Sequence, residues 1–118
     1  MPMCEVIFYE TQDGFIPVLD FLNSLNNKME AKVAWTIHRL EQFGHSLREP
    51  YSKPLGDGIF ELRVQSGGDI SRVLYFFIVN GRAVLTHGFI KKTQKTPAQE
   101  IERAKKYRDD YLRRNGDL

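Results

Sequence analysis

The sequence predicts an α+β domain whose elements follow the order β-α-α-β-β-β-α. Two stretches in the first half carry apolar residues at helical spacing, and three strand-like runs in the second half are separated by glycine-containing turns. An amphipathic stretch after a proline closes the chain. Because consecutive strands joined by short turns pair antiparallel, we expect an antiparallel sheet with a helical hairpin and a C-terminal helix. Residues 1–118 fit a single domain.

The first half of the chain predicts one strand and two helices. Cys4–Tyr9 is typical of a short strand, with β-branched and aromatic residues. Phe15–Leu25 has apolar residues spaced as on one face of a helix, and Pro17 is tolerated because it falls in the first turn. A second helix is expected over Lys28–Phe43, and Gly44 stands where a glycine commonly ends a helix.

The second half predicts a sheet built from hairpins. Residues 45–58 are expected to form a loop, and the strands that follow it are Ile59–Val64, Ile70–Val79 and Arg82–Lys91. Asn80-Gly81 links the last two strands, and this dipeptide is the strongest short hairpin signal because both turn positions adopt positive φ. In a hairpin that turns there, position i pairs with roughly position 161 − i. Arg72 is therefore expected to lie opposite Phe89.

The last helix is expected to open in the segment Thr96–Gln99. Thr96 is the predicted N-cap, Pro97 the first helical residue and Gln99 the third, which is the arrangement of a capping box. Apolar residues then recur at helical spacing as far as Leu112, while the outer face is heavily charged. These features predict an amphipathic helix that packs on the sheet.

Charged residues are unevenly distributed, although the net charge is only +2. Residues 1–50 carry four Lys/Arg against seven Asp/Glu, whereas residues 51–118 carry thirteen against eight. Between Leu62 and Gln99, six basic residues accompany one acid, Asp69. A surface with an excess of one charge attracts partners of the opposite charge. The second half of the chain therefore predicts a polyanionic partner.

The composition disfavours several classes of protein. No apolar run reaches the roughly 18–20 residues of a membrane span, and the N-terminus lacks the basic residues that begin a signal peptide. The single cysteine, Cys4, excludes an internal disulfide and a cysteine-based zinc site. We expect a cytoplasmic protein with no membrane partner. No acids, histidines or thiols cluster at ligand spacing, so neither a metal site nor a cofactor is predicted.

Basic side chains are expected to converge at one end of the sheet. They come from the segment GFIKKTQKTP, from the two preceding strands and from a glycine-containing loop: Lys91, Lys92, Lys95, Arg63, Arg72 and Lys53. Taken singly, each lysine is equally typical of a solvated strand end, and Arg63 of a salt bridge to Glu61. Packing like charges together costs free energy unless a polyanion binds them, so jointly the residues predict a binding site.

Such a cluster has the groups that RNA cleavage requires. The reaction needs a base for a 2′-hydroxyl, cations for the phosphate charge and an acid for the leaving oxygen. Arginine stays protonated and suits the phosphate, whereas a lysine beside other cations has a lowered pKa and can transfer protons. His87, in the last predicted strand, is a possible participant, although a strand histidine is more often a structural group. Phe89 and Tyr51 are candidate surfaces for base stacking.

Four stretches together resemble the RelE/HigB-like toxins of type II toxin–antitoxin systems, in particular the phage-derived HigB-like branch: KPLGDGIFELR, SRVLYFF, LTHGFIKKTQKTP and EIERAKKYRDDYL. The resemblance covers nearly the whole chain. It implies a RelE-like fold and a ribosome-dependent endoribonuclease that inhibits translation by cutting mRNA in the decoding site. It also implies a cognate helix-turn-helix antitoxin, HigA-like, through which alone the toxin would associate with operator DNA.

The resemblance assigns catalytic roles to four basic residues. Arg72 matches the arginine that begins the RVLY strand, and Lys91 and Lys92 match the basic residues after the last strand. Arg63 corresponds to a basic position on the strand before Arg72. On this hypothesis the two arginines bind the scissile phosphate, and Lys91 or Lys92 transfers protons.

Lys53 and Lys95 are expected to follow the RNA backbone without taking part in the chemistry. Arg72→Ala is expected to abolish cleavage and to leave the fold intact. Two alternatives stay open at this point. The first is a ParE-like gyrase poison, since that family shares the fold, and the second is a catalytically inactive basic module that binds nucleic acid or an acidic antitoxin segment.

Overall fold

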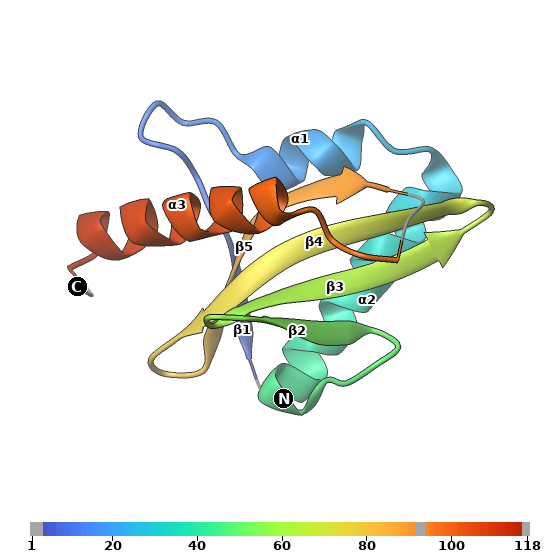
Figure 1. The fold of residues 1–118 in the computed structure, drawn as a ribbon. Helices are drawn as coiled ribbons and strands as arrows, with labels where there is room; N and C mark the ends of the chain where they lie inside the picture. The colour runs from blue at the N-terminus through green and yellow to red at the C-terminus, as the bar shows by residue number, and fades with distance from the viewer. Residues whose placement is uncertain (1–3, 92–93, 117–118) are drawn as a thin grey trace.

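A five-stranded sheet with helices on both faces forms the protein, and the α+β fold class is confirmed (Figure 1). The computed structural model describes residues 4–91 and 94–116. The elements in chain order are β1 (Glu5–Phe8), α1 (Pro17–Asn23), α2 (Asn27–Phe43), a 3₁₀ turn (Gly44–Ser46), β2 (Ser52–Gly56), β3 (Ile59–Ser66), β4 (Asp69–Ile78), β5 (Arg82–Ile90) and α3 (Ala98–Arg114). Across the described ranges, no helix has the length and apolar character needed to cross a membrane.

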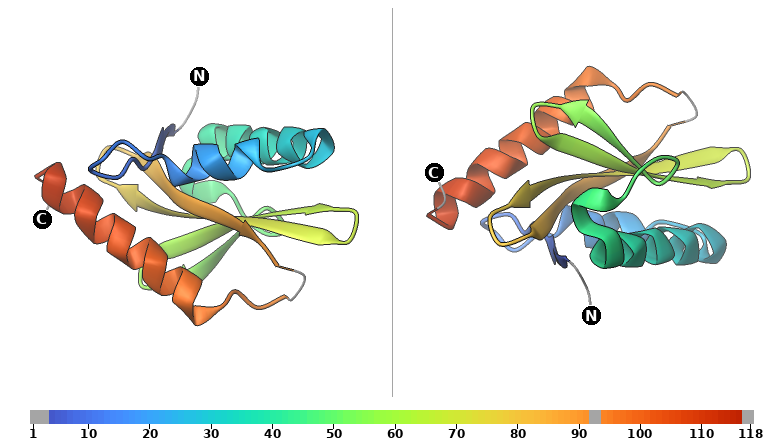
Figure 2. Two further views of the ribbon diagram at one scale, coloured as in Figure 1. Left: turned by 90° about the horizontal axis from the view of Figure 1, so that it is seen from above. Right: turned by 90° about the horizontal axis from the view of Figure 1, so that it is seen from below.

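The sheet separates two hydrophobic cores. On one face, α1 and α2 pack through Val18, Val33 and Leu40 against alternate strand residues such as Leu62 and Val73. On the other face, α3 packs through Ala104 against a smaller cluster that contains Ile59, Leu74 and Phe76. The two views in Figure 2 show the helical pair on one side of the sheet and α3 on the other. The predicted amphipathic helices thus each bury one face.

A strand that the sequence did not predict, β2, lies within residues 45–58, where a loop was expected. β2 pairs antiparallel with β3 at the sheet edge. Its sequence, SKPLG, does not alternate apolar and polar residues, and Pro54 is tolerated because an edge strand has a side without ladder hydrogen bonds. The connecting residues Asp57 and Gly58 have φ of 54° and 79°, the conformation for which Asp-Gly is a known hairpin signal. The Asp57-Gly58 dipeptide was therefore the signal in the sequence from which β2 could have been predicted.

The expectation of a wholly antiparallel sheet was wrong for β1, which pairs in parallel with β5. Only strands linked by short turns reveal their pairing in the sequence. β1 is instead connected onward through α1 and α2, and its partner lies more than seventy residues away, since Glu5 pairs with Arg82. The sheet is therefore mixed, with the order β1-β5-β4-β3-β2.

The β4–β5 hairpin turns at Asn80-Gly81 as predicted, but beside the turn the strands are one residue out of the predicted register, since Ile78 pairs with Arg82. The predicted pairing returns only further along the strands. Asn80 and Gly81 have φ of 75° and 72°, and Arg72 lies opposite Phe89. A β-bulge lies between these points: Tyr75 pairs with Leu85, but Leu74 pairs with His87, which leaves Thr86 as the extra residue. The hydroxyl of Thr86 donates to the carbonyl of Leu74 at 3.0 Å, so the extra residue supplies its own hydrogen bond to the neighbouring strand.

The predicted capping box at the start of α3 was wrong. The helix spans Ala98–Arg114 with Pro97 at the N-cap and no side-chain cap. Thr96 is buried, and its hydroxyl donates at 2.6 Å to the carboxylate of Glu61 on β3. A buried carboxylate needs hydrogen-bond donors. The Thr96 hydroxyl therefore donates to Glu61 and does not cap the helix. The 3₁₀ turn after α2, in contrast, begins at Gly44, which is the predicted C-cap.

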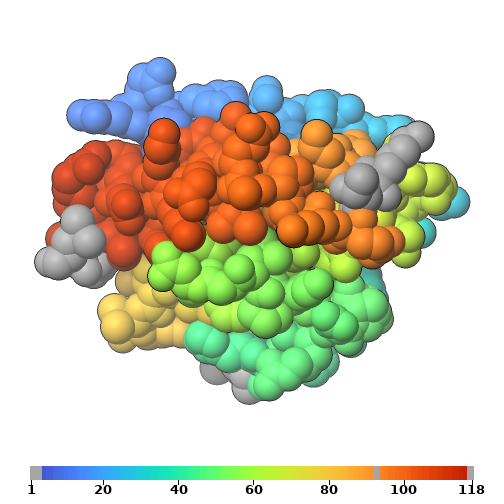
Figure 3. Space-filling view, viewed as in Figure 1, coloured from blue at the N-terminus to red at the C-terminus, as the bar shows by residue number. Residues whose placement is uncertain are grey.

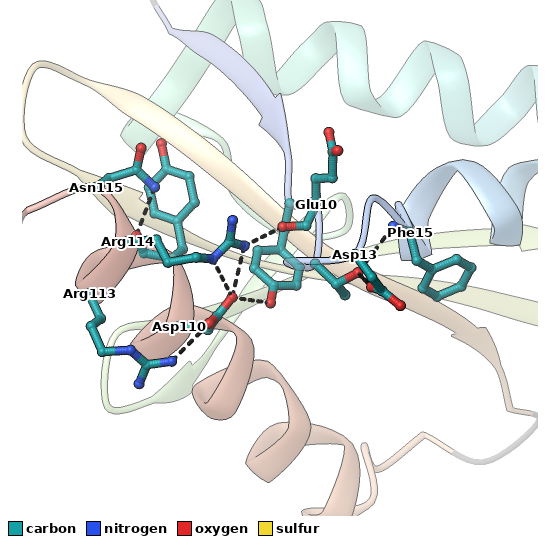
Figure 4. Close-up of polar contacts among 10 residues, drawn as sticks. Glu10, Asp13, Phe15, Asp110, Arg113, Arg114 and Asn115 are labelled. Carbon is teal, nitrogen blue, oxygen red and sulfur yellow. Dashed lines mark hydrogen bonds and ion pairs between the residues drawn. The ribbon is translucent and has the colours of Figure 1, made fainter.

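Asp110 attaches the C-terminal end of α3 to the chain after β1 (Figure 4). Its carboxylate accepts hydrogen bonds from the Tyr9 hydroxyl at 2.5 Å, from Arg113 at 2.9 Å and from Arg114 at 2.9 Å. Arg114 also donates to the backbone carbonyl of Glu10. The hydrogen bonds from Arg114 and Tyr9 hold the pKa of Asp110 below its ordinary value, because they favour the charged carboxylate.

The stability contribution of Asp110 is expected to depend on pH in acid. Because the folded pKa of Asp110 is lowered, its contribution is present above the unfolded value near 3.8 and is lost as the pH falls through the folded value. We expect urea unfolding between pH 2 and pH 6 to show a smaller acid-dependent loss of stability for Asp110→Asn than for the wild type. Asp109→Asn, which alters the exposed neighbouring carboxylate, is the matched control and should retain the wild-type slope.

Candidate functional site

A buried ion pair lies beneath the predicted basic cluster. Arg72 on β4 and Glu61 on β3 have 0% and 1% of their surface exposed, and Arg72 Nε lies 3.3 Å from Glu61 Oε1. Burial lowers the pKa of Arg72, and the Glu61 carboxylate opposes this effect. Arginine nevertheless stays charged in proteins. The pair therefore places two opposite charges beneath the surface, and the Thr96 hydroxyl is a further donor to the carboxylate.

Arg63 lies directly opposite Arg72 in the β3–β4 pairing and is closer to the surface. Its side chain is 20% exposed, and Nε lies 3.9 Å from Glu61 Oε2. Nη2 donates to the Gln94 side chain at 2.8 Å and to the Gln94 carbonyl at 3.3 Å. A salt bridge from Arg63 to Glu61 was one interpretation of the sequence. The two groups do face each other, but at 3.9 Å, and the guanidinium is mainly held by Gln94.

The predicted lysines that the structure describes are all exposed. Lys53 on β2 pairs with Glu61, so it projects from the same sheet face, and it is exposed. Lys91 is exposed, and its backbone joins the site: its carbonyl accepts from Arg72 Nη1 at 3.2 Å and its amide donates to Ile70 at 3.1 Å. Lys95 is exposed in the segment before α3. Lys92 lies outside the described residues.

The segment that precedes α3 and α3 itself lie on the front of the molecule, over the sheet (Figure 3). α3 packs on the face that carries Leu74 and Phe76, which by alternation also carries Arg72. The site is therefore formed at one end of this face, where β3, β4 and the residues after β5 meet. Among the side chains that the structure describes, no group of three or more histidine, cysteine, aspartate or glutamate residues has the arrangement of a metal site.

His87 is a residue of β5 and is only 3% exposed, and its side chain faces α3. Its Nε2 lies 3.1 Å from Glu100 on α3, and its Nδ1 lies 3.1 Å from the Thr86 hydroxyl. Burial lowers the pKa of His87, and the hydrogen bond to Glu100 opposes this effect. Both ring nitrogens have side-chain partners, which supports the structural role that was one of its two predicted interpretations.

A groove beside the basic cluster was not predicted. It has a volume of about 460 Å³ and is lined by Lys32, Trp35 and Thr36 of α2, by Glu49, Pro50 and Tyr51 before β2, by Arg63, Val64, Gln65 and Ile70 at the β3–β4 hairpin, and by Gln94. Trp35 is 50% exposed. Tyr51, a predicted stacking residue, lines this groove, whereas Phe89, the other one, packs in the smaller core under α3.

The sequence signal for the groove was the position of Trp35. It lies outside the apolar stripe of α2, whose buried residues are Met29, Val33, Thr36, Ile37 and Leu40. A large aromatic residue on the polar face of an amphipathic helix has no core to fill. Such a residue indicates a contact with something other than the sheet.

Two comparisons with known proteins bear on the chain. The sequence model of a family described as "Phage derived protein Gp49-like (DUF891)" matches residues 20–109, which is more than half of the chain and includes Lys53, Glu61, Arg63 and Arg72. A comparison with curated proteins found no match.

Proposed function

The chain belongs to the Gp49-like family of phage-derived proteins, a family of RelE/HigB-type toxins, and from this premise we propose that it is a ribosome-dependent mRNA endoribonuclease. As a toxin of a toxin–antitoxin pair it has an antitoxin partner, which we propose to be a HigA-like helix-turn-helix protein. The ribosome and mRNA would be its targets, in the cytoplasm, and cleavage would inhibit translation and arrest growth.

The observation that carries this proposal is the gathering of Lys53, Arg63 and Lys91 around the buried Glu61–Arg72 pair. A phosphate group that passes over this end of the sheet would meet the Arg63 guanidinium, which Gln94 holds in place, and the exposed Lys53 and Lys91. Preorganised charge of this kind stabilises the negative charge that develops on a phosphate during cleavage. Lys95 would extend the positive surface along the RNA backbone.

The proposed reaction is attack of the RNA 2′-hydroxyl on the adjacent phosphorus. A base removes the 2′-hydroxyl proton, the 2′-oxygen bonds to phosphorus, and the bond to the 5′-oxygen breaks as an acid gives that oxygen a proton. Lys91 or Lys92 would transfer these protons, and Arg63 would bind the phosphate oxygens. Arg72 has no exposed surface, so we assign it a positioning role, through Glu61 and the Lys91 carbonyl, in place of direct contact with phosphate.

Arg63→Ala is expected to reduce cleavage by about tenfold to a hundredfold, the loss of one charge-assisted hydrogen bond to phosphate. The measurement is primer extension on a defined mRNA in a translating extract, with and without ribosomes. Arg82→Ala removes a cation from the opposite end of β5 and is the control, which should cleave as the wild type does. Arg63→Lys should retain part of the activity.

Other outcomes of this experiment would select the alternatives. Cleavage that persists at the wild-type rate in Arg63→Ala would contradict the site. Stalled DNA–gyrase complexes without cut mRNA would identify a gyrase poison of the ParE type. Salt-sensitive RNA binding without cleavage in the extract would identify an inactive binding module.

A further inference from the structure

Beyond the cation cluster, we propose that the groove between α2 and the β3 edge binds a nucleobase of single-stranded RNA, stacked on Trp35. This inference rests on the proposed function for its choice of RNA as the ligand. It adds a base-binding position on the α2 side of the sheet, which adjoins the cleavage site at Arg63.

The groove lies where β3 extends beyond its edge neighbour. The pairing of β2 with β3 begins at Ser52 and Leu62, and the Arg63 amide donates to the Tyr51 carbonyl at 2.9 Å. β3 continues to Ser66 in the hairpin with β4. Seen from below, this hairpin projects past β2, and α2 lies beneath it (Figure 2, right). A strand of RNA that leaves Arg63 can therefore enter the groove directly.

The aromatic wall of the groove is held by a cation. The Arg39 guanidinium lies 5.1 Å from the Trp35 ring centroid, 4.7 Å from that of Phe43 and 5.4 Å from that of Tyr51. The rings of Trp35 and Tyr51 meet edge to face at 5.6 Å. These contacts fix the indole while half of its surface stays exposed. An immobilised, exposed aromatic ring is the platform on which proteins stack single-stranded bases.

The polar residues of the groove suit a nucleotide. Arg63 and Lys32 provide cations for phosphate at its two sides, and Lys32 Nζ is already oriented by a hydrogen bond of 3.2 Å to the Gln65 carbonyl. The amide side chains of Gln65 and Gln94 are able to donate to and accept from a base edge. The volume of about 460 Å³ falls in the usual range of roughly 300–1,000 Å³ for small-ligand sites.

Glu49 favours a neutral nucleobase over an anionic group in the groove. Its carboxylate also lines the groove, and it would repel an acidic peptide placed there. A carboxylate instead accepts a hydrogen bond from the exocyclic amino group of a base. The combination of an exposed indole, flanking cations and one carboxylate therefore favours RNA over an acidic antitoxin segment.

The first test uses Trp35 as its own reporter, because it is the single tryptophan of the chain. Hexaadenylate added to the full-length toxin at low salt is expected to quench the tryptophan fluorescence in a saturable manner. An abasic hexamer of equal charge and a hexaglutamate peptide are the comparison probes, and both should quench far less. Equal quenching by either probe, or none by hexaadenylate, would overturn the proposal.

The second test compares variants by the fluorescence anisotropy of labelled hexaadenylate. Trp35→Ala is expected to weaken binding by about tenfold, the typical loss of one stacked base, and Trp35→Phe should recover most of the affinity. Phe15→Ala removes an exposed aromatic residue that does not line the groove and should bind as the wild type does. Wild-type affinity in Trp35→Ala would refute the groove as a base site, and circular dichroism melts check that each variant is folded.

The failure of this inference is distinguishable from the failure of the proposed function. If the wild type cuts no mRNA in the extract but binds hexaadenylate through Trp35, the nuclease function fails and the groove stands. If mRNA is cut and Trp35→Ala binds hexaadenylate normally, the function stands and the groove fails.

Discussion

Arg72→Ala is expected to lower the free energy of unfolding by about 3–5 kcal/mol, because it leaves the Glu61 carboxylate buried without its cation. Arg72 and Glu61 lie 3.3 Å apart at the ion-pair atoms, and neither has more than 1% of its surface exposed. Removing the guanidinium also removes the donor to the Lys91 carbonyl. Urea denaturation followed by circular dichroism measures the loss.

Two comparison variants test this explanation. Arg63→Ala removes a partly exposed guanidinium 3.9 Å from the same carboxylate and is expected to cost no more than about 1 kcal/mol. The double variant Glu61→Leu/Arg72→Met replaces the pair by apolar residues of similar volume and should restore stability to near the wild-type value. Arg72→Ala as stable as Arg63→Ala would contradict the buried ion pair as the source of the expected loss.

This result bears on how Arg72 is tested as a functional residue. From the sequence, Arg72→Ala was expected to abolish cleavage and leave the fold intact, but the burial of its partner Glu61 argues against an intact fold. Lost cleavage in that variant would follow from unfolding as readily as from lost chemistry. Arg72→Lys keeps a cation beside Glu61 while removing the fork of donors, so it is the more informative replacement.

Gly88→Ala is expected to destabilise the protein by about 3 kcal/mol, at the upper end of the usual range for an overpacked core. A methyl group at this position would lie 2.3 Å from Cδ2 and 2.7 Å from Cε2 of Phe21. Phe21 is buried in the larger core, where α1 packs on β5. Either the ring must therefore leave its position in the core or α1 must shift from the sheet. Thermal and urea unfolding measure the effect.

Gly68→Ala is the matched control, since a methyl group there meets no heavy atom within 4 Å and φ is not positive. It should change stability by less than about 0.5 kcal/mol. Phe21→Ala provides a second comparison: in that background the additional change Gly88→Ala should cost little, because the clashing ring is gone. Additive losses in the double variant would contradict the clash as the cause.

Local signals in the sequence were sufficient for most of the fold. Asn80-Gly81 specified where β4 and β5 turn. The register beside the turn differs by one residue from the prediction, and the bulge at Thr86 restores the predicted pairing of Arg72 with Phe89. The helices followed from their apolar periodicity. β2 was missed because an edge strand exposed to solvent has no such periodicity. The parallel pairing of β1 was missed because no turn links it to β5.

The sequence predicted the relative position of the two arginines but not the burial of Arg72. Alternation and register correctly placed Arg63 beside Arg72. They did not reveal that Glu61 and Thr96 would bury Arg72, because burial depends on where the segment before α3 packs. The groove combines Trp35, Tyr51 and Arg63 from three separate segments, so its existence depends on tertiary contacts that no local pattern contains.

The bulge at Thr86 makes β5 intolerant of changes in length. Side chains of β5 alternate between the two faces of the sheet, and this alternation changes phase at Thr86. The single inserted residue therefore turns His87 and Phe89 toward α3 and Gly88 toward Phe21. Deleting Thr86 would turn every later side chain of β5 to the opposite face of the sheet and place the ring of Phe89 under α1. A one-residue deletion in β5 would therefore have to be matched by a second change that restores the phase.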